Sequence, residues 1–438
     1  MDPAVAKLQA LVRIPTVSRR DPALVDTEAF DRLLAEMARR FPLLHAHLDV
    51  TRVGTHGLLL HWRGDSAARP VVLMAHLDVV PVEGQAWTLP PFGGDVVDDA
   101  VWGRGTLDDK GCVVGICEAV ELLLGDGFTP AQDVWLSLGC DEETTGSAAR
   151  AAVDELRRRG VRPWFVLDEG GAIALEAFPG VTAPIGVVGV TEKGTTSIEL
   201  VATGDGGHAS TPATNGTTVR LARAITRLDS AAMPGRVPAT TVEMLRRLAP
   251  HAPAPLRPVL ANAGRLGPAL ARVLPRLGPE AAALVRTTLA VTTLEGSAAL
   301  NVIATTARAG VNIRVMVGDT VDGAVDFVRR TIRDDAIEIR VVEANEPSPV
   351  SPLDDAFALI EARIAEVFPD AVPTPYVMLA ATDSRFFTAI CERVYRFAPF
   401  RMSAAQRAAI HAADEHLRVE DLVDGVRWYR RLIEELPA

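Results

Sequence analysis

PVVLMAH, residues 70–76, is an apolar run that ends in a histidine, and an aspartate follows two residues later. DVWLSLGC at 133–140 has the same character and precedes three acids, and WFVLD at 164–168 itself ends in an acid. Strands that are apolar throughout are typical of parallel sheets, because helices cover both faces of such a sheet. These stretches therefore predict an α/β fold with a mostly parallel sheet sandwiched by helices.

Helical patterns alternate with these strands. One helix is expected from about Lys110 to Leu124 and another from about Ser147 to Arg159, and a glycine follows each of them as a C-cap. The same rhythm resumes after residue 349 and ends in an amphipathic helix near the C-terminus. We predict that this first domain is discontinuous and comprises residues 1–190 and 347–438.

The pattern changes between residues 191 and 346, where strands and helices follow one another in the order βαββαβ. That order is typical of the ferredoxin-like arrangement, an antiparallel sheet with helices on one face. We therefore expect an inserted ferredoxin-like α+β lid domain at 191–346. Residues 233–288 within it are rich in Pro, Leu, Ala and Arg, and we interpret them as helical hairpins inserted in the lid.

Composition narrows the classes of function. The 438 residues exceed the usual size of a single core, and the net charge of −11 disfavours nucleic acid as a partner. The N-terminal residues lack the features of a secretory signal, and no apolar run approaches the length of a membrane span. The cysteines show no CxxC pairing, which favours reduced thiols and a cytoplasmic protein. They are Cys112, Cys117, Cys140 and Cys391.

Acidic and imidazole side chains gather at the ends of all three predicted strands. The carboxyl ends of parallel strands meet at one edge of a sheet, where open α/β proteins bind their ligands. Another acidic pair, Asp108 and Asp109, opens the helix that begins at Lys110. Carboxylates this dense repel one another unless positive charge lies among them. A pair of metal ions meets that need, and nitrogen and oxygen donors suit zinc, with cobalt or manganese as alternatives.

Each of these residues also has an ordinary structural explanation. His76 alone is compatible with a hydrogen-bonded histidine at a strand end, and Asp108 alone with a helix N-cap. Glu142 or Glu143 alone would be an acid in a first helical turn, which the helix dipole favours. The coincidence of every cluster at one sheet edge favours a metal site over these separate explanations.

Seven segments resemble, in order and in wording, the co-catalytic zinc metallopeptidase family that includes carboxypeptidase S, glutamate carboxypeptidase and aminoacylase. They are MAHLDVVPVEGQAWTLPPFGG (74–94), VWGRGTLDDKG (101–111), LGCDEETTGS (138–147), DEGG (168–171), GHAS (207–210), TDSRFF (382–387) and the isolated His411. The sequences of these segments resemble most the carboxypeptidase S branch, which also contains enzymes that act on N-fatty-acyl amino acids. The resemblance implies a zinc exopeptidase-like fold and hydrolysis of an amide or peptide bond next to a free carboxylate.

The resemblance also implies the cofactor and its ligands. Two Zn²⁺ ions are expected, with cobalt or manganese as substitutes. Five residues match the ligand positions of the family: Asp108 as the carboxylate that bridges both ions, His76 and Asp168 on one ion, and Glu143 and His411 on the other.

Further roles follow from the same correspondence. Asp78 would orient the imidazole of His76, and Glu142 would act as the general base. His208 would stabilise the oxyanion from the lid, and in the family the equivalent histidine reaches a neighbouring subunit's site, which implies a homodimer through the lid domain. Family members also have a cis peptide after the bridging aspartate, which implies one at 108–109.

Three residues are candidates for binding the substrate. Arginine has the planar fork best suited to a free carboxylate, and Arg385 matches a substrate-binding position of the family. The motif around it has Thr382 and Asp383 where many relatives have glycines. Arg314 is a second candidate on a lid strand, although a strand arginine is as often merely solvated. Asn301 resembles a lid residue of the family that contacts the substrate carboxylate.

Two other functions fit parts of the sequence. A non-catalytic metal- or ligand-binding protein could use the same scaffold, but such a protein usually loses the base or a ligand, and all of them are present here. The insertion at 233–288 could contact a partner or a membrane surface, although amphipathic stretches more often cover a core. The substrate stays open between a peptide, an N-acetyl amino acid and a long-chain N-acyl amino acid, and the apolar insertion favours a hydrophobic group.

Overall fold

The computed structural model describes residues 2–438, and its largest element is a mixed, mostly parallel sheet. Within the described residues this central sheet has ten strands in the order β1-β2-β6-β3-β7-β17-β9-β8-β18, with β16 paired to β9. The strands are β1 (Asp49–Val53), β2 (Gly57–Trp62), β3 (Ser66–His76), β6 (Gln132–Gly139), β7 (Phe165–Asp168), β8 (Ala172–Ala174), β9 (Ile185–Glu192), β16 (Val372–Met378), β17 (Val394–Arg396) and β18 (Arg401–Met402). The pairs β3/β6, β3/β7 and β7/β17 at its centre are parallel.

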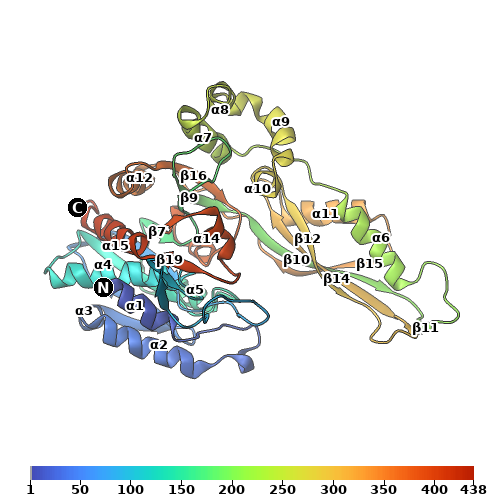
Figure 1. The fold of residues 1–438 in the computed structure, drawn as a ribbon, viewed down its shortest axis with the longest axis horizontal. Helices are drawn as coiled ribbons and strands as arrows, with labels where there is room; N and C mark the ends of the chain where they lie inside the picture. Colours follow the sequence, from blue (N-terminus) through green and yellow to red (C-terminus); the bar gives the residue numbers. More distant parts are fainter. Residues whose placement is uncertain (1) are drawn as a thin grey trace.

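Helices cover both faces of this sheet, as predicted (Figure 1). One face packs against α1 (Pro3–Val12), α4 (Lys110–Gly125), α12 (Asp355–Val367) and α15 (Val419–Glu434), and the other against α5 (Ser147–Arg158) and α13 (Ser384–Phe387). Successive residues of β3 face opposite sides, so Leu73 belongs to the first core and Val72 and Met74 to the second. A strand buried on both faces has to be apolar throughout, which explains the composition of 70–76.

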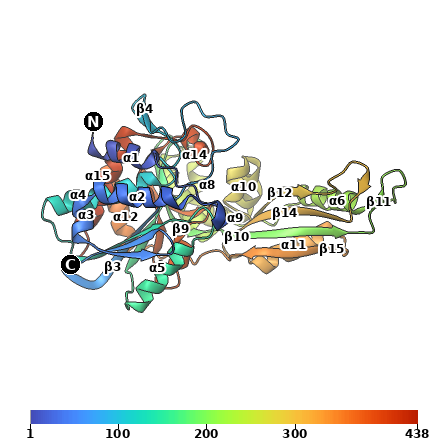
Figure 2. The same ribbon diagram turned by 90° about the horizontal axis from the view of Figure 1, so that it is seen from below.

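The lid is a four-stranded antiparallel sheet that extends away from the central sheet (Figure 2). Its strand order is β12-β14-β10-β15, from β10 (Gly194–Thr203), β12 (Thr288–Glu295), β14 (Thr306–Val315) and β15 (Ile337–Ala344). The helices α6 (Thr217–Asp229) and α11 (Val321–Ile332) pack against alternate residues of β10 and β14. Along the chain the elements follow in the expected order βαββαβ.

Residues 233–288, which we call the helical insertion, lie beside the central sheet, whereas the sequence suggested hairpins within the lid. The insertion contains α7 (Ala239–Leu248), α8 (Arg257–Ala261), α9 (Ala263–Val273) and α10 (Pro279–Ala283). Its apolar core includes Leu245 and Leu248 and packs on Ile185 of β9 and on Val372 and Tyr376 of β16 (Figure 1). The apolar surface along β9 and β16 is the physical reason for this position, since each large side chain buried there contributes about 1.5–3 kcal/mol.

Two small sheets complete the fold. β4 (Asp95–Val97), β5 (Ala100–Trp102) and β19 (His416–Arg418) form a three-stranded antiparallel sheet beside the loop that carries Asp108. At the tip of the lid, β11 (Gly207–His208) pairs with β13 (Val302–Ile303). Among residues 2–438, none of the helices combines the length and the apolar character that crossing a bilayer requires.

Candidate metal centre

The predicted acids meet at the carboxyl edge of the central sheet. In the parallel register, His76 at the end of β3 lies opposite Gly139 at the end of β6, and β7 ends beside them at Asp168. The loop after β6 carries Glu142 and Glu143. Strands that start far apart in the sequence therefore deliver their terminal side chains to one place, as the topology of open α/β sheets requires.

Asp108 lies at the centre of this cluster and faces two imidazoles. His76 Nε2 is 2.9 Å from its Oδ1, and His411 Nε2 is 2.9 Å from its Oδ2. The same atom of His411 is also 3.1 Å from Glu143 Oε2. One carboxylate with a separate imidazole on each oxygen is the arrangement of a group that bridges two cations.

The donor set fits metal ions on its chemistry. Two groups of side chains offer ligand atoms that all lie within 4.8 Å of one another, one with Asp108 and Glu143 and the other with Asp109 and Glu169, and both include His76. Imidazole nitrogens and carboxylate oxygens are the usual ligands of zinc and related divalent ions. Several carboxylates crowded in a buried space are stable only when a cation lies among them.

The pKa values of these groups reflect the crowding. Burial raises the pKa of Glu142 well above its usual range, and nearby carboxylates add to the effect. Hydrogen bonds to Asp108 and Glu143 raise the pKa of His411 to about 10. Burial opposes the charging of His76, but the negative charges of Glu169 and Asp108 outweigh it and raise the pKa of that imidazole.

Asp78 ties the first histidine to the segment that holds Glu142. The Nδ1 of His76 donates to the carbonyl oxygen of Asp78 at 3.0 Å, which leaves Nε2 free to bind a metal. The carboxylate of Asp78 accepts the backbone N–H groups of Glu142 and Glu143 at 3.1 and 3.2 Å. Asp78 is fully buried, so one residue holds both groups, the imidazole through its carbonyl oxygen and the segment of Glu142 through its carboxylate.

The residues expected to bind the substrate or the oxyanion fall into two groups. His208 and Asn301 lie at the tip, where β11 and β13 end, and both are exposed. The tip is far from the metal cluster of the same chain (Figure 1), and the Nδ1 of His208 hydrogen-bonds the Ser210 hydroxyl at 2.7 Å. The structure therefore does not bring these two residues to the cluster within one chain.

The two candidate arginines lie elsewhere: Arg314 on β14 of the lid and Arg385 on α13 of the other domain. Arg314 donates to Asn312 Oδ1 at 3.1 Å and to Thr195 Oγ1 at 2.9 Å. Burial lowers the pKa of Arg314, an effect that Glu343 opposes and the positive charge of Arg385 reinforces. Arg385 donates to the Thr382 carbonyl oxygen at 3.1 Å. The two guanidinium groups are thus close enough to repel each other, and an anion between them would relieve that repulsion.

Comparison with known proteins gives this geometry a family. The model of peptidase family M20/M25/M40 matches residues 72–435. The chain belongs to that family. It is accordingly a metal-dependent hydrolase that cleaves an amide or peptide bond in a small-molecule substrate, as the resemblance implied.

Relatives in the M20/M25/M40 family cover nearly the whole chain. An N-fatty-acyl-amino acid synthase/hydrolase of Xenopus tropicalis is 35% identical over 98% of this chain and 85% of its own length. A probable carboxypeptidase S-like protein of Dictyostelium discoideum is 35% identical over 90% of this chain and 77% of its own.

Solved structures of the same family share the fold. A metallo-carboxypeptidase of Sulfolobus solfataricus has a TM-score of 0.72 at 17% identity and covers 99% of both chains. Human carnosine dipeptidase 1 has a TM-score of 0.73 at 17% identity, over 99% of this chain and 95% of its own.

Asp168, one of the expected ligands, lies at the end of β7 beside the cluster. Asp168 belongs to neither ligand group among residues 2–438, and its Oδ2 accepts the backbone N–H of Ser384 at 2.9 Å. Glu169, the next residue, points into the cluster, with Oε1 3.5 Å from His76 Nε2. Burial raises the pKa of Glu169 to about 8, and Asp108 contributes to the rise. Glu169 is therefore the acid of the DEGG segment whose carboxylate lies next to the His76 imidazole.

A buried ion pair that the sequence did not point to supports the loop of Asp108. Glu415 accepts the backbone N–H groups of Leu107 at 2.8 Å and of Asp108 at 3.1 Å. Arg104 donates to the same carboxylate at 2.7 Å, and both side chains are fully buried. The peptide between Asp108 and Asp109 is cis, as the family resemblance implied. In the sequence, the one hint of a role for Glu415 is that it follows the expected ligand His411 by four residues.

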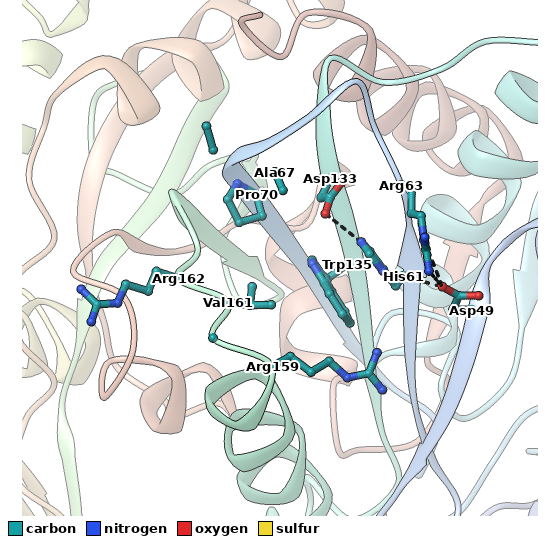
Figure 3. A pocket seen from close by; sticks show the side chains of 12 residues that line it. Asp49, His61, Arg63, Ala67, Pro70, Asp133, Trp135, Arg159, Val161 and Arg162 are labelled. Atoms are coloured by element: carbon teal, nitrogen blue, oxygen red, sulfur yellow. Dashed lines mark hydrogen bonds and ion pairs between the residues drawn. The ribbon is translucent and has the colours of Figure 1, made fainter.

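A cavity of about 490 Å³ lies at the opposite edge of the central sheet (Figure 3). It is lined by residues at the amino ends of β3 and β6 and by the segment before β7. In it, His61 stacks on Trp135 with ring centroids 3.9 Å apart and hydrogen-bonds Asp133 at 2.8 Å. These polar groups satisfy one another, so the cavity shows no chemistry comparable to that of the metal cluster.

Proposed function

We propose that this chain is a two-zinc hydrolase that cleaves the amide bond next to a free carboxylate, with N-acyl amino acids that carry an apolar acyl chain as its preferred substrates. The observation that carries the proposal is Asp108, whose two oxygens each face a different imidazole at 2.9 Å. The substrate class is supported by the 35% identity to an N-fatty-acyl-amino acid synthase/hydrolase over 98% of the chain. A carboxypeptidase activity is the alternative within the same chemistry, since a carboxypeptidase S-like relative is equally similar.

The metal pair would be held by His76, Asp108, Glu143, Glu169 and His411. Zinc is the ion that this mixture of imidazole and carboxylate favours, with cobalt and manganese as substitutes. When bound, the ions lower the pKa of a water molecule and polarise the substrate carbonyl group. Their positive charge would also lower the raised pKa values of the surrounding carboxylates.

Glu142 is the group that moves the proton. Its position is fixed by the hydrogen bond from its backbone N–H to Asp78, and its carboxylate is buried beside the cluster. A buried carboxylate with a raised pKa holds a proton more readily than a solvated one, so it can accept the proton of the attacking water and return it to the leaving nitrogen. Asp78 fixes the geometry in which this transfer takes place.

The remaining roles are assigned to Arg385 on α13 and to three residues of the lid. Arg385 and Arg314 would bind the free carboxylate of the substrate, because a guanidinium fork matches its two oxygens. His208 would stabilise the oxyanion, with Asn301 beside it on the substrate. Since both lie at the exposed tip, they would serve the cluster of a second chain, which makes a homodimer through the lid part of the proposal.

The organisation of the chain supports two further assignments. Residues 1–190 and 347–438 would form the catalytic domain and residues 191–346 the lid, whose helical insertion packs on the central sheet. The four cysteines are all free and buried, which suits the reducing environment of the cytoplasm.

The test is hydrolysis of a panel of N-fatty-acyl amino acids, N-acetyl amino acids and dipeptides by zinc-loaded protein, with chelated protein as the control. Zinc-dependent cleavage that is fastest for the fatty-acyl amino acids is the expected result. Preferred cleavage of dipeptides would reassign the substrate. Binding of these compounds by zinc-replete protein without any cleavage would favour the non-catalytic binding protein.

A further inference from the structure

The helical insertion differs in charge from the rest of the molecule. Residues 233–288 contain eight arginines, no lysine or aspartate, and two glutamates, which gives a formal charge of +6. The whole chain carries −11, so the residues outside the insertion carry −17. One compact module therefore concentrates positive charge on an acidic protein.

Much of this positive charge is exposed and not neutralised. Arg265 and Arg272 on α9 and Arg276 just after it are exposed, and none of them forms an ion pair with a carboxylate among residues 2–438. Of the two acids of the insertion, Glu243 pairs with Arg247 at 2.9 Å, on α7. The positive charges of these three guanidinium groups are thus exposed to solvent and not paired with carboxylates of the described residues.

Large apolar side chains are exposed beside these arginines. The exposed fractions are 38% for Leu266, 47% for Val273 and 60% for Leu277. We call these three residues, together with Arg265, Arg272 and Arg276, the α9 face. Apolar side chains scattered singly over a surface need no explanation, but three within twelve residues next to a basic row form a patch.

The helical repeat places the two kinds of side chain in adjacent rows. Arg265 and Arg272 are seven residues apart, and so are Leu266 and Val273, so each pair repeats on one side of α9. The two rows are separated by about 100° around the helix axis. The buried Leu270 is four residues after Leu266, so it borders the apolar row and packs into the core of the insertion. The basic row therefore lies farthest from the anchored side, and the exposed apolar row lies between the two.

We propose that the α9 face is a docking surface for an anionic lipid bilayer. Its arginines would contact lipid headgroups, and its leucines and valine would enter the boundary between headgroups and acyl chains, as interfacial amphipathic helices do. The negative charge of the bilayer explains the basic row, whereas a second copy that docked through the same face would place arginine against arginine. A nucleic acid would use the arginines but not the neighbouring apolar row. This surface is independent of the substrate assigned to the metal centre.

The experiment is co-sedimentation of the full-length protein with phosphatidylcholine vesicles that contain or lack phosphatidylglycerol, at low and at physiological ionic strength. We expect binding that requires phosphatidylglycerol and weakens with salt. Arg265→Gln combined with Arg272→Gln should weaken binding about 10- to 30-fold. Leu266→Ser combined with Val273→Ser should weaken it about tenfold, because the apolar contact is lost.

The control is Arg223→Gln combined with Arg330→Gln, a pair of exposed arginines on the lid helices α6 and α11. This variant should bind vesicles as the unmodified protein does, and thermal unfolding should be unchanged in all three variants, since every substitution is on the surface. Equal binding to both kinds of vesicle, or equal weakening by the control, would overturn the proposal. Weakening by the arginine variant alone would also overturn it and mark a site for polyanions such as nucleic acid.

Discussion

The carboxyl edge of the central sheet and the tip of the lid both carry residues of the proposed site, but in opposite states. At the sheet edge, Asp108 and His76 are held by buried hydrogen bonds before any ligand arrives. At the lid tip, the imidazole of His208 is exposed, and its hydrogen bonds are to Ser210, two residues later. The difference teaches that one chain assembles the metal cluster completely and the substrate site only in part. Under the proposed function, the preorganised half would carry out the proton chemistry, and the exposed half would act on the cluster of a second chain.

The largest expected effect belongs to the sheet edge. Glu142→Gln should lower kcat about 10³-fold, because it removes the proton carrier without changing the size of the side chain. Metal content, measured by mass spectrometry of the purified protein, should stay at the unmodified level. If the carboxyl edge of the sheet only binds metal and Glu142 transfers no proton, kcat will fall by less than tenfold.

The next effect separates the two regions directly. His208→Ala should lower kcat about 10²-fold by removing an oxyanion donor, with little change in metal content. Mixing this variant with Glu142→Gln and allowing the subunits to exchange should restore about a quarter of the original activity, because each mixed dimer then has one complete site. Absence of any recovery, with exchange verified by native mass spectrometry, would place His208 outside a shared site.

A smaller effect tests which acid of the DEGG segment belongs to the cluster. Glu169→Gln should weaken binding of one of the two metal ions by about 10- to 100-fold, whereas Asp168→Asn should leave the stoichiometry at two. Asp168→Asn is the matched control, since it makes the same chemical change one residue earlier. Metal titration followed by calorimetry measures both. The opposite pattern would assign the ligand to Asp168.

The smallest effect concerns a buried carboxylate outside the metal cluster. Neither oxygen of Asp421 on α15 has a hydrogen-bond partner within residues 2–438, and burial raises its pKa to about 7. The folded pKa exceeds the unfolded one, so the folded state binds the proton more tightly, and this contribution is lost as pH rises from about 4 through 7. Asp421→Asn should therefore stabilise the protein by about 1–3 kcal/mol at pH 8 and not at pH 4.

Chemical unfolding at both pH values measures this difference. Asp424→Asn on the same helix, whose carboxyl is less buried, is the control and should give a smaller gain. A gain of equal size at pH 4 and pH 8 would show that the charge of Asp421 is not responsible.

The sequence predicted much of this molecule because its patterns are local. The apolar run at 70–76 requires a strand buried on both faces, and the βαββαβ order of the lid follows from the alternation of periods along the chain. His76, Asp108, Glu143 and His411 lie together as the resemblance implied, since parallel strands bring their carboxyl ends to one edge.

What the sequence could not predict depends on side-chain direction and tertiary packing. Asp168 and Glu169 are adjacent acids, and only the geometry at the end of β7 decides which one turns towards His76. Glu415 accepts hydrogen bonds from a loop more than 300 residues earlier, and no sequence pattern predicts a contact over that separation. The helical insertion was assigned to the lid because it lies within the lid in sequence, whereas its apolar side matches β9 and β16.

That position of the insertion also governs how the molecule can come apart. The backbone passes between the central sheet and the lid at four places: from β9 to β10, from α6 to α7, from α10 to β12 and from β15 to α12. A proteolytic cut in any one of these passages leaves three intact tethers, so limited digestion should produce nicked protein and not separated domains. For the same reason the lid cannot be expressed as one continuous fragment, and any tilt of the lid must bend four segments together.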